Sequence, residues 1–228
     1  MAAQTPKGNM PVVVLKDDAS QVKGREAQKN NIAAAKIIAE IVHTSLGPKG
    51  MDKMLVDSLG DVTITNDGAT ILKEIDVQHP AAKMLVEISK TTDNEVGDGT
   101  TSAVVLAGAL LEHAEALVLQ DVHPTIIVDG YRKAGRKAKE FLDQIADNVS
   151  PTDNGILLKI AKTSMQTKLV RKDSEQLADM IVKAVKAVAE QSGDKFTVDI
   201  DDIKVEKKAG GSIKDSKIIQ GIVLDKEI

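Results

Sequence analysis

Apolar residues recur through most of this chain at the three- and four-residue spacing of one face of a helix. Residues 31–46 show this pattern and end at Gly47-Pro48, a pair that commonly terminates a helix. His79 and His123 each precede a proline and a long amphipathic stretch, and proline is tolerated at the first position of a helix. Both histidines are therefore predicted to be helix caps, and the fold class is predicted to be mainly α.

The most apolar stretch, residues 99–119, carries aliphatic side chains around much of the helical circumference. Such a helix is expected to lie in the middle of a bundle. No stretch approaches the roughly 18 apolar residues that a membrane span needs, and residues 1–10 lack an apolar signal core. The protein is therefore expected to be neither secreted nor bound to a membrane.

Short strands and a second structural unit are also predicted. Residues 61–65 alternate as a strand, and Asp67 then lies at the corner where this strand turns into a helix starting at Ala69. The character of the sequence changes after residue 149. The elements predicted there are a helix at 150–161, a polar break at 163–168, a helix at 174–191 and strand-like runs at 196–200, 203–205 and 218–224. Near the start, residues 12–15 are either a packed edge strand or a strand that pairs with another chain.

Composition narrows the class of protein. Of 228 residues, 42% are hydrophobic but only 1% are aromatic, so the core must be built from aliphatic side chains. The formal net charge is −4 and both signs are mixed along the helices, which offers no basic face for nucleic acid. The chain has no cysteine, which excludes disulfides and thiolate chemistry and fits the cytoplasm.

Two glycine-rich segments are candidate phosphate sites: Leu46-Gly47-Pro48-Lys49-Gly50 and Gly97-Asp98-Gly99-Thr100-Thr101-Ser102. Each lies where a predicted helix ends or begins, so unpaired backbone N–H groups occur beside glycines that allow an anion to approach. Asp98 would be repelled by phosphate unless a hard cation such as Mg2+ bridged them. The two segments together predict a site for a magnesium-bound nucleotide.

Each motif alone also has a structural interpretation. Asp98 and Thr100 suit an ordinary helix N-terminus, and Gly-Pro is common after any helix. The familiar nucleotide motifs do not fit, because Gly130 and Gly135 have the spacing of a P-loop without its Lys-Ser/Thr pair and no strand precedes a Gly-x-Gly-x-x-Gly. The four histidines lack the spacing of metal ligands, and the aspartates of residues 199–202 lack the remainder of a calcium loop.

Five longer motifs, in order, resemble those of group II chaperonin subunits of the thermosome and eukaryotic cytosolic type. The resemblance covers about residue 24 to the end. The motifs are residues 44–54 (TSLGPKGMDKM), 63–70 (TITNDGAT), 79–83 (HPAAK), 95–101 (EVGDGTT) and 123–127 (HPTII).

This resemblance implies an ATP-driven folding chamber made of two stacked rings of sister subunits, which receives unfolded proteins. It implies that residues 1–149 form the N-terminal part of a helical, ATP-binding equatorial domain. Residues 150–215 would form part of an α/β intermediate domain, and residues 216–228 would begin an apical domain. Subunits of the family are about twice as long, so the missing half leaves a second catalytic aspartate and the substrate-binding surface without counterparts.

The resemblance also assigns roles to residues. Asp67 matches the catalytic acid that positions the attacking water, and Asp98 matches the ligand of Mg2+. The residues matched to nucleotide contacts are Leu46, Gly47, Pro48, Gly99, Thr100, Thr101 and Ser102, with Gln166, Thr167 and Lys168 from a nucleotide-sensing loop. Whether the chain alone is an enzyme stays open, and a non-hydrolysing piece that joins or blocks chaperonin rings is the alternative.

Overall fold

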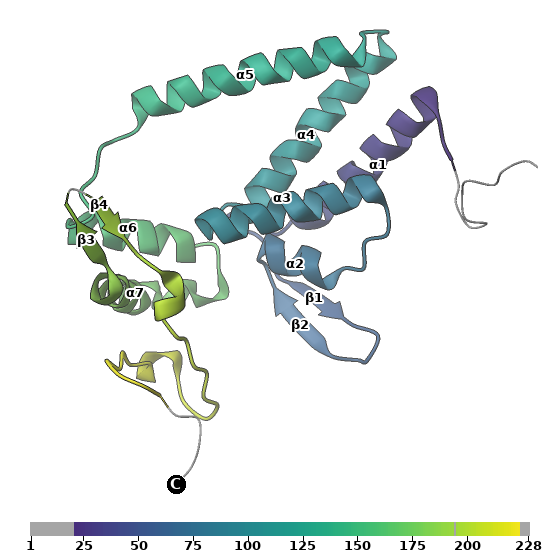
Figure 1. The fold of residues 1–228 in the computed structure, drawn as a ribbon. Coiled ribbons are helices and arrows are strands. Elements are labelled where there is room, and N and C mark those ends of the chain that lie inside the picture. Colours follow the sequence, from purple (N-terminus) through teal and green to yellow (C-terminus); the bar gives the residue numbers. More distant parts are fainter. Residues whose placement is uncertain (1–20, 194, 224–228) are drawn as a thin grey trace, which may run out of the picture.

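The computed structural model describes residues 21–193 and 195–223, and within these ranges the fold is mainly α, as predicted (Figure 1). The first helices and strands are α1 (Gly24–His43), β1 (Lys53–Val56), β2 (Val62–Thr65), α2 (Gly68–Glu74), α3 (Pro80–Val96), α4 (Thr100–Leu119) and α5 (Pro124–Ile145). The later ones are α6 (Asn154–Met165), the 3-10 helix η1 (Leu169–Asp173), α7 (Ser174–Val188), β3 (Glu190–Ser192), β4 (Lys195–Thr197), η2 (Ile200–Asp202) and η3 (Ile213–Asp215).

The main core lies where α1, α3 and α4 pack together over α2. Its fully buried side chains include Val42 of α1, Ile71 and Leu72 of α2 and Val104 of α4. These side chains are aliphatic, as the near absence of aromatic residues requires. They hold together the ends of the helices from which the two glycine-rich segments emerge.

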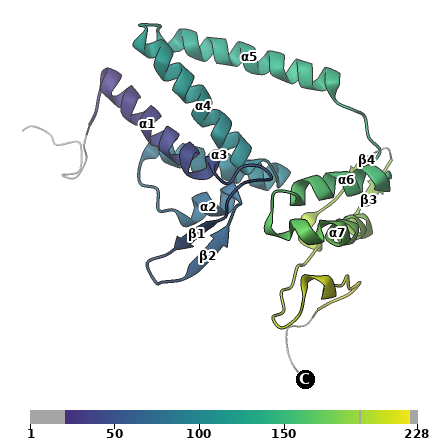
Figure 2. The ribbon, with the colours of Figure 1, turned by 180° about the vertical axis from the view of Figure 1, so that it is seen from behind.

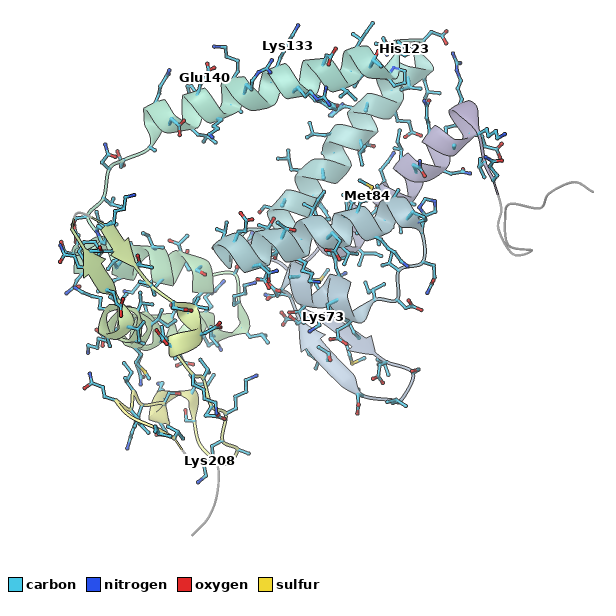
Figure 3. The ribbon with its side chains drawn as sticks, viewed as in Figure 1. Lys73, Met84, His123, Lys133, Glu140 and Lys208 are labelled. Carbon is cyan, nitrogen blue, oxygen red and sulfur yellow. The ribbon has the colours of Figure 1, made fainter. Side chains whose placement is uncertain are left out.

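The helix ends follow the local sequence signals. His79 and His123 cap α3 and α5, accepting hydrogen bonds through Nδ1 from the N–H of Ala81 at 3.2 Å and of Thr125 at 3.3 Å. Figure 3 shows His123 at the start of α5. Both capping predictions are confirmed.

A β-hairpin precedes the aspartate corner. Strands β1 and β2 pair antiparallel, from Lys53 opposite Thr65 to Val56 opposite Val62. Strand β2 was expected from its alternation, whereas β1 was not. The hairpin returns the chain to the core at the start of α2, and this fixes the position of Asp67.

The expected central position of α4 is confirmed only in part. Helices α1, α2 and α3 pack against it, but Leu106 and Leu119 are each 61% exposed. Helix α4 is long and apolar enough to cross a membrane, so the expectation that no stretch approaches this length is wrong. The core helices of soluble proteins also meet this criterion, so length and composition alone do not place α4 in a membrane. Lys36 of α1 forms ion pairs with Glu112 and Glu115 on its surface.

The second half of the chain forms another helical group, in which α6 packs against α7 beside the β3–β4 hairpin. Figures 1 and 2 show α5 extending from the end of α4 toward this group. Helix α6 continues to Met165, so the predicted polar break begins later than expected.

Two strand predictions are wrong. Residues 203–205 are not a strand, and neither are the described residues of the run 218–224. The run 203–205 alternates in polarity and the run 218–224 is largely apolar, but neither meets a partner strand within the described residues, and a strand-like sequence without a partner does not make a sheet. The run 12–15 lies outside the described residues.

Candidate functional site

Asp67 occupies the corner between β2 and α2, as predicted. It is the N-cap of α2, and its Oδ2 atom accepts hydrogen bonds from Thr70 N at 3.0 Å and from Thr70 Oγ1 at 3.1 Å. This capping fixes the direction of the carboxylate, because an N-cap side chain must reach back to the first turn of its helix. The other carboxylate oxygen, Oδ1, remains available for contacts outside α2.

Two distant segments meet Asp67 Oδ1. Lys168 Nζ lies 2.7 Å from it, and Thr100 Oγ1 donates to it at 3.4 Å. The ion pair is partly covered, since 26% of the Asp67 side chain and 34% of the Lys168 side chain are exposed. Asp67 therefore joins the start of α4 to the segment that follows α6.

The pKa of Asp67 lies below its ordinary value. Burial of the carboxyl group raises the pKa, but the hydrogen bond from Lys168, the backbone and hydroxyl hydrogen bonds from Thr70 and the positive charge of Lys168 together lower it further than burial raises it. Asp67 is thus a carboxylate at neutral pH, as a group that orients a water or faces a cation must be.

The loop before α4 presents unpaired donors. Gly97 and Gly99 both have left-handed backbone conformations, with φ of 70° and 77°, and no side chain caps the start of α4. The N–H groups of the first turn, from Thr100 to Ser102, have no intrahelical acceptor because the ladder begins with Ala103 N to Gly99 O. Such a helix start suits an anion.

Close packing fixes the position of this turn. A Cβ atom on Gly68 would lie 2.6 Å from Thr101 Oγ1 and 2.9 Å from Thr101 N and Cα, so only glycine fits there. Thr100 and Thr101 are buried, whereas Ser102 and Asp98 are exposed. Asp98 Oδ1 accepts a hydrogen bond from Gly99 N at 2.8 Å, which leaves the other carboxylate oxygen free of protein hydrogen bonds within the described structure.

The loop after α1 is a compact turn. Gly47 has φ of 82°, Gly50 N donates to Gly47 O at 3.0 Å, and Met51 N donates to Thr44 O at 2.9 Å. A Cβ on Gly47 would meet nothing within 4 Å, so its surface is open to a ligand. Leu46 is 40% exposed beside it.

The segment between α6 and α7 touches both parts of the site. Gln166 is the exposed C-cap of α6, the Thr167 carbonyl accepts from Asn66 Nδ2, and Lys168 is the N-cap of η1. Arg171 Nη1 donates to Pro48 O at 3.3 Å. Within the described residues no hydrogen bond joins loop 46–50 directly to loop 97–102, so their link runs through Asp67, Lys168 and Arg171.

Sequence reasoning did not assign roles to three contacting residues, Asn66, Thr70 and Arg171. Asn66 and Thr70 lie inside the motif at residues 63–70, and their place next to Asp67 in that motif is the sequence signal that marks them as part of the site. Arg171 donates to a backbone carbonyl, which leaves no signature in the sequence.

The residues fit a nucleotide-bound cation better than a protein-only metal site. No group of three His, Cys, Asp or Glu side chains that could hold a metal occurs in the described ranges. Magnesium commonly takes only one or two carboxylates and completes its shell with phosphates and water. Asp98, beside an uncapped helix start and glycines with open space, supplies this kind of partial ligand set.

Comparison with known proteins decides the family. The sequence profile of the TCP-1/cpn60 chaperonin family matches residues 38–228. The chain belongs to this chaperonin family. It is 57% identical over 218 residues to a thermosome subunit of Pyrococcus abyssi, and 58% identical over 218 residues to thermosome subunit beta of Thermococcus sp. (strain KS-8).

A third relative of this chaperonin chain is thermosome subunit alpha of Archaeoglobus fulgidus, which is 57% identical over 218 residues. Each alignment covers 96% of this chain and 40% of the relative. The chain thus spans about 40% of the length of the curated relatives it matches. These relatives confirm the resemblance to thermosome-type chaperonins that the five motifs predicted.

Proposed function

We propose that this chain provides the ATP-binding region of an ATP-dependent chaperonin subunit, which assembles with sister subunits into rings and folds unfolded proteins in the cytoplasm. The observation that carries the proposal is the meeting of Asp67, Thr100 and Lys168 beside the uncapped start of α4. Relatives named thermosome subunits supply the biological context.

The proposed nucleotide contacts divide between two loops. The N–H groups and hydroxyls of Thr100, Thr101 and Ser102, with Gly99, would hold phosphate oxygens, because unpaired N–H groups and a helix dipole favour negative charge there. Leu46, Gly47 and Pro48 would form the opposite wall. Asp98 would hold Mg2+, which would neutralise phosphate charge when bound.

Asp67 is the proposed catalytic acid. It is ionised, its Oδ2 is held by Thr70 and its Oδ1 faces Thr100 and Lys168 outside α2, which suits a carboxylate that positions a water molecule for phosphoryl transfer. Its Oδ1 atom is engaged by Lys168, and movement of Lys168 toward the phosphates would free an acceptor position on this oxygen for a water. Lys168, released, would face the phosphates, with Gln166 and Thr167 beside it.

The experiment is a calorimetric titration of the chain with Mg-ATP. We expect binding by the wild type and a loss of at least ten-fold in affinity for Asp98→Ala, because removing the carboxylate removes a ligand of the cation. Glu87→Ala, an exposed acid on α3 with no hydrogen bond in the described structure, is the matched control and should bind normally. Equal Mg-ATP affinity of Asp98→Ala and wild type would refute the metal assignment, and no binding by the wild type would refute the nucleotide site.

A further inference from the structure

The short helix η1 carries two cations toward opposite parts of the candidate site. Lys168 is its N-cap and reaches Asp67, whereas Arg171 lies three residues later and reaches the carbonyl of Pro48. Arg171 N donates to Lys168 O at 3.0 Å, which closes the turn between them. The two cations therefore belong to one hydrogen-bonded turn.

The Lys168 and Arg171 contacts of this turn differ in the kind of competitor that would break them. The Lys168–Asp67 contact depends on charge, and a cation or phosphate at the site would compete with it. The Arg171 contact is made to a main-chain carbonyl whose position follows from the tight turn at Gly47 and Gly50. It does not involve Asp67. A second neutral contact, from the Asn66 amide to the Thr167 carbonyl, lies on the Asp67 side.

We propose that Arg171 is a positioning residue of this site, which ties the turn carrying Lys168 to the loop at Pro48. This inference rests on the proposed nucleotide site. With Arg171 in place, the loop after α1 and the turn that carries Lys168 are connected, so both would face a phosphate bound at the proposed site. Without it, loop 46–50 loses its link to η1, while α6 and α7 still hold η1 in position.

The test uses the 228-residue chain with Arg171→Ala, Arg171→Lys and Lys172→Ala. Lys172 is the next residue, exposed and without a hydrogen bond or ion pair in the described structure, so its removal controls for charge. Arg171 is itself exposed, and Asn66 and Lys168 keep their contacts, so Arg171→Ala is expected to fold. Arg171→Lys retains a donor at this position and serves as the second variant if the alanine variant is poorly folded.

The first readout is hydrogen exchange of residues 44–51 without nucleotide. We expect several-fold faster exchange in Arg171→Ala, near wild-type rates in Arg171→Lys and no change in Lys172→Ala. Unchanged exchange in Arg171→Ala would overturn the inference whether or not the chain binds ATP.

The second readout is Mg-ATP affinity. We expect Arg171→Ala to weaken binding about five-fold, the effect of one lost hydrogen bond, and Arg171→Lys to recover most of it. In a Lys168→Ala background, Arg171→Ala should cost less than it does in the wild type, because part of its effect acts through Lys168. If the double variant lost affinity by the product of the two single losses, the two residues would act independently and the inference would be overturned. Absence of binding by the wild type would instead overturn the proposed function, and the exchange experiment would then decide the tie on its own.

Discussion

Lys168 Nζ lies 2.7 Å from Asp67 Oδ1, although the two residues are 101 positions apart in the chain. The pair joins the region built from α1 to α4 to the region built from α6 and α7. Because Asp67 also caps α2 and accepts from Thr100, one carboxylate links three of the four segments that the sequence marked as functional. The coupling between these regions can therefore be tested at a single side chain.

Asp67→Asn tests the charge of this contact while keeping the cap, since asparagine caps helices as well as aspartate does. The pKa of Asp67 in the folded protein lies below its ordinary value of 3.8, so ionised Asp67 stabilises the fold above that value. This stability is lost as the pH falls through the lowered pKa. We expect Asp67→Asn to reduce the free energy of unfolding by about 1 kcal/mol at pH 7, a modest value for a partly exposed pair.

Chemical denaturation at several pH values provides the measurement. The difference between wild type and Asp67→Asn should shrink below pH 3.8 and vanish in stronger acid. Asp129→Asn, in an exposed pair with Arg132 on α5, should leave stability unchanged. A difference that stays constant with pH would contradict a charge-dependent contact.

Gly68→Ala tests the close packing behind the phosphate loop. The added Cβ would collide with the backbone of Thr101, which cannot move without shifting the start of α4. We expect a loss of about 1–3 kcal/mol in the free energy of unfolding. Gly130→Ala, on α5 with open space around it, should instead raise stability by about 0.5–1 kcal/mol, since alanine is the better helix former. If both substitutions had the same effect, the contact between Gly68 and Thr101 would not exist.

Gly108→Ala tests how closely α1 and α4 approach. A Cβ on Gly108 would lie 2.2 Å from the Cβ of Ala39, so the two helices would have to separate. The expected cost is about 1–3 kcal/mol in the free energy of unfolding, and Gly135→Ala on α5 is the matched control without a neighbour. Adding Ala39→Gly to Gly108→Ala should recover part of the loss, because it removes the atom that collides. If thermal or denaturant unfolding showed that the free-energy losses of Gly108→Ala and Ala39→Gly simply add in the double variant, this contact would be contradicted.

The sequence predicted local features well. The helix end at Gly97, the histidine caps and the corner at Asp67 depend on residues within one turn of each other, so local signals suffice. The helix predicted to run to residue 46 instead ends at His43. The strand predictions at 203–205 and 218–224 are wrong because a strand needs a partner strand, which the local pattern of apolar residues cannot reveal. The exposure of Leu106 on α4 was also missed, since periodicity shows which helix is apolar but not what covers it.

The candidate site was predicted in its parts but not in its connections. Glycine, aspartate and threonine motifs indicated Asp67, Asp98 and the start of α4. The pairing of Lys168 with Asp67 is a contact across the fold, and the contact of Arg171 uses a backbone acceptor at Pro48, so neither has a sequence pattern of its own. The assigned roles in nucleotide and metal binding stay predictions.

The central claim is that one Mg-ATP is held by both the loop at residues 46–48 and the start of α4. Titration of the isotope-labelled chain with Mg-ATP, followed by backbone amide NMR, tests this most directly. We predict that the largest saturable shifts fall together on Leu46, Gly47 and Gly99 to Ser102, with one shared dissociation constant. Shifts confined to only one of these loops, or concentrated elsewhere such as on α5, would contradict the account.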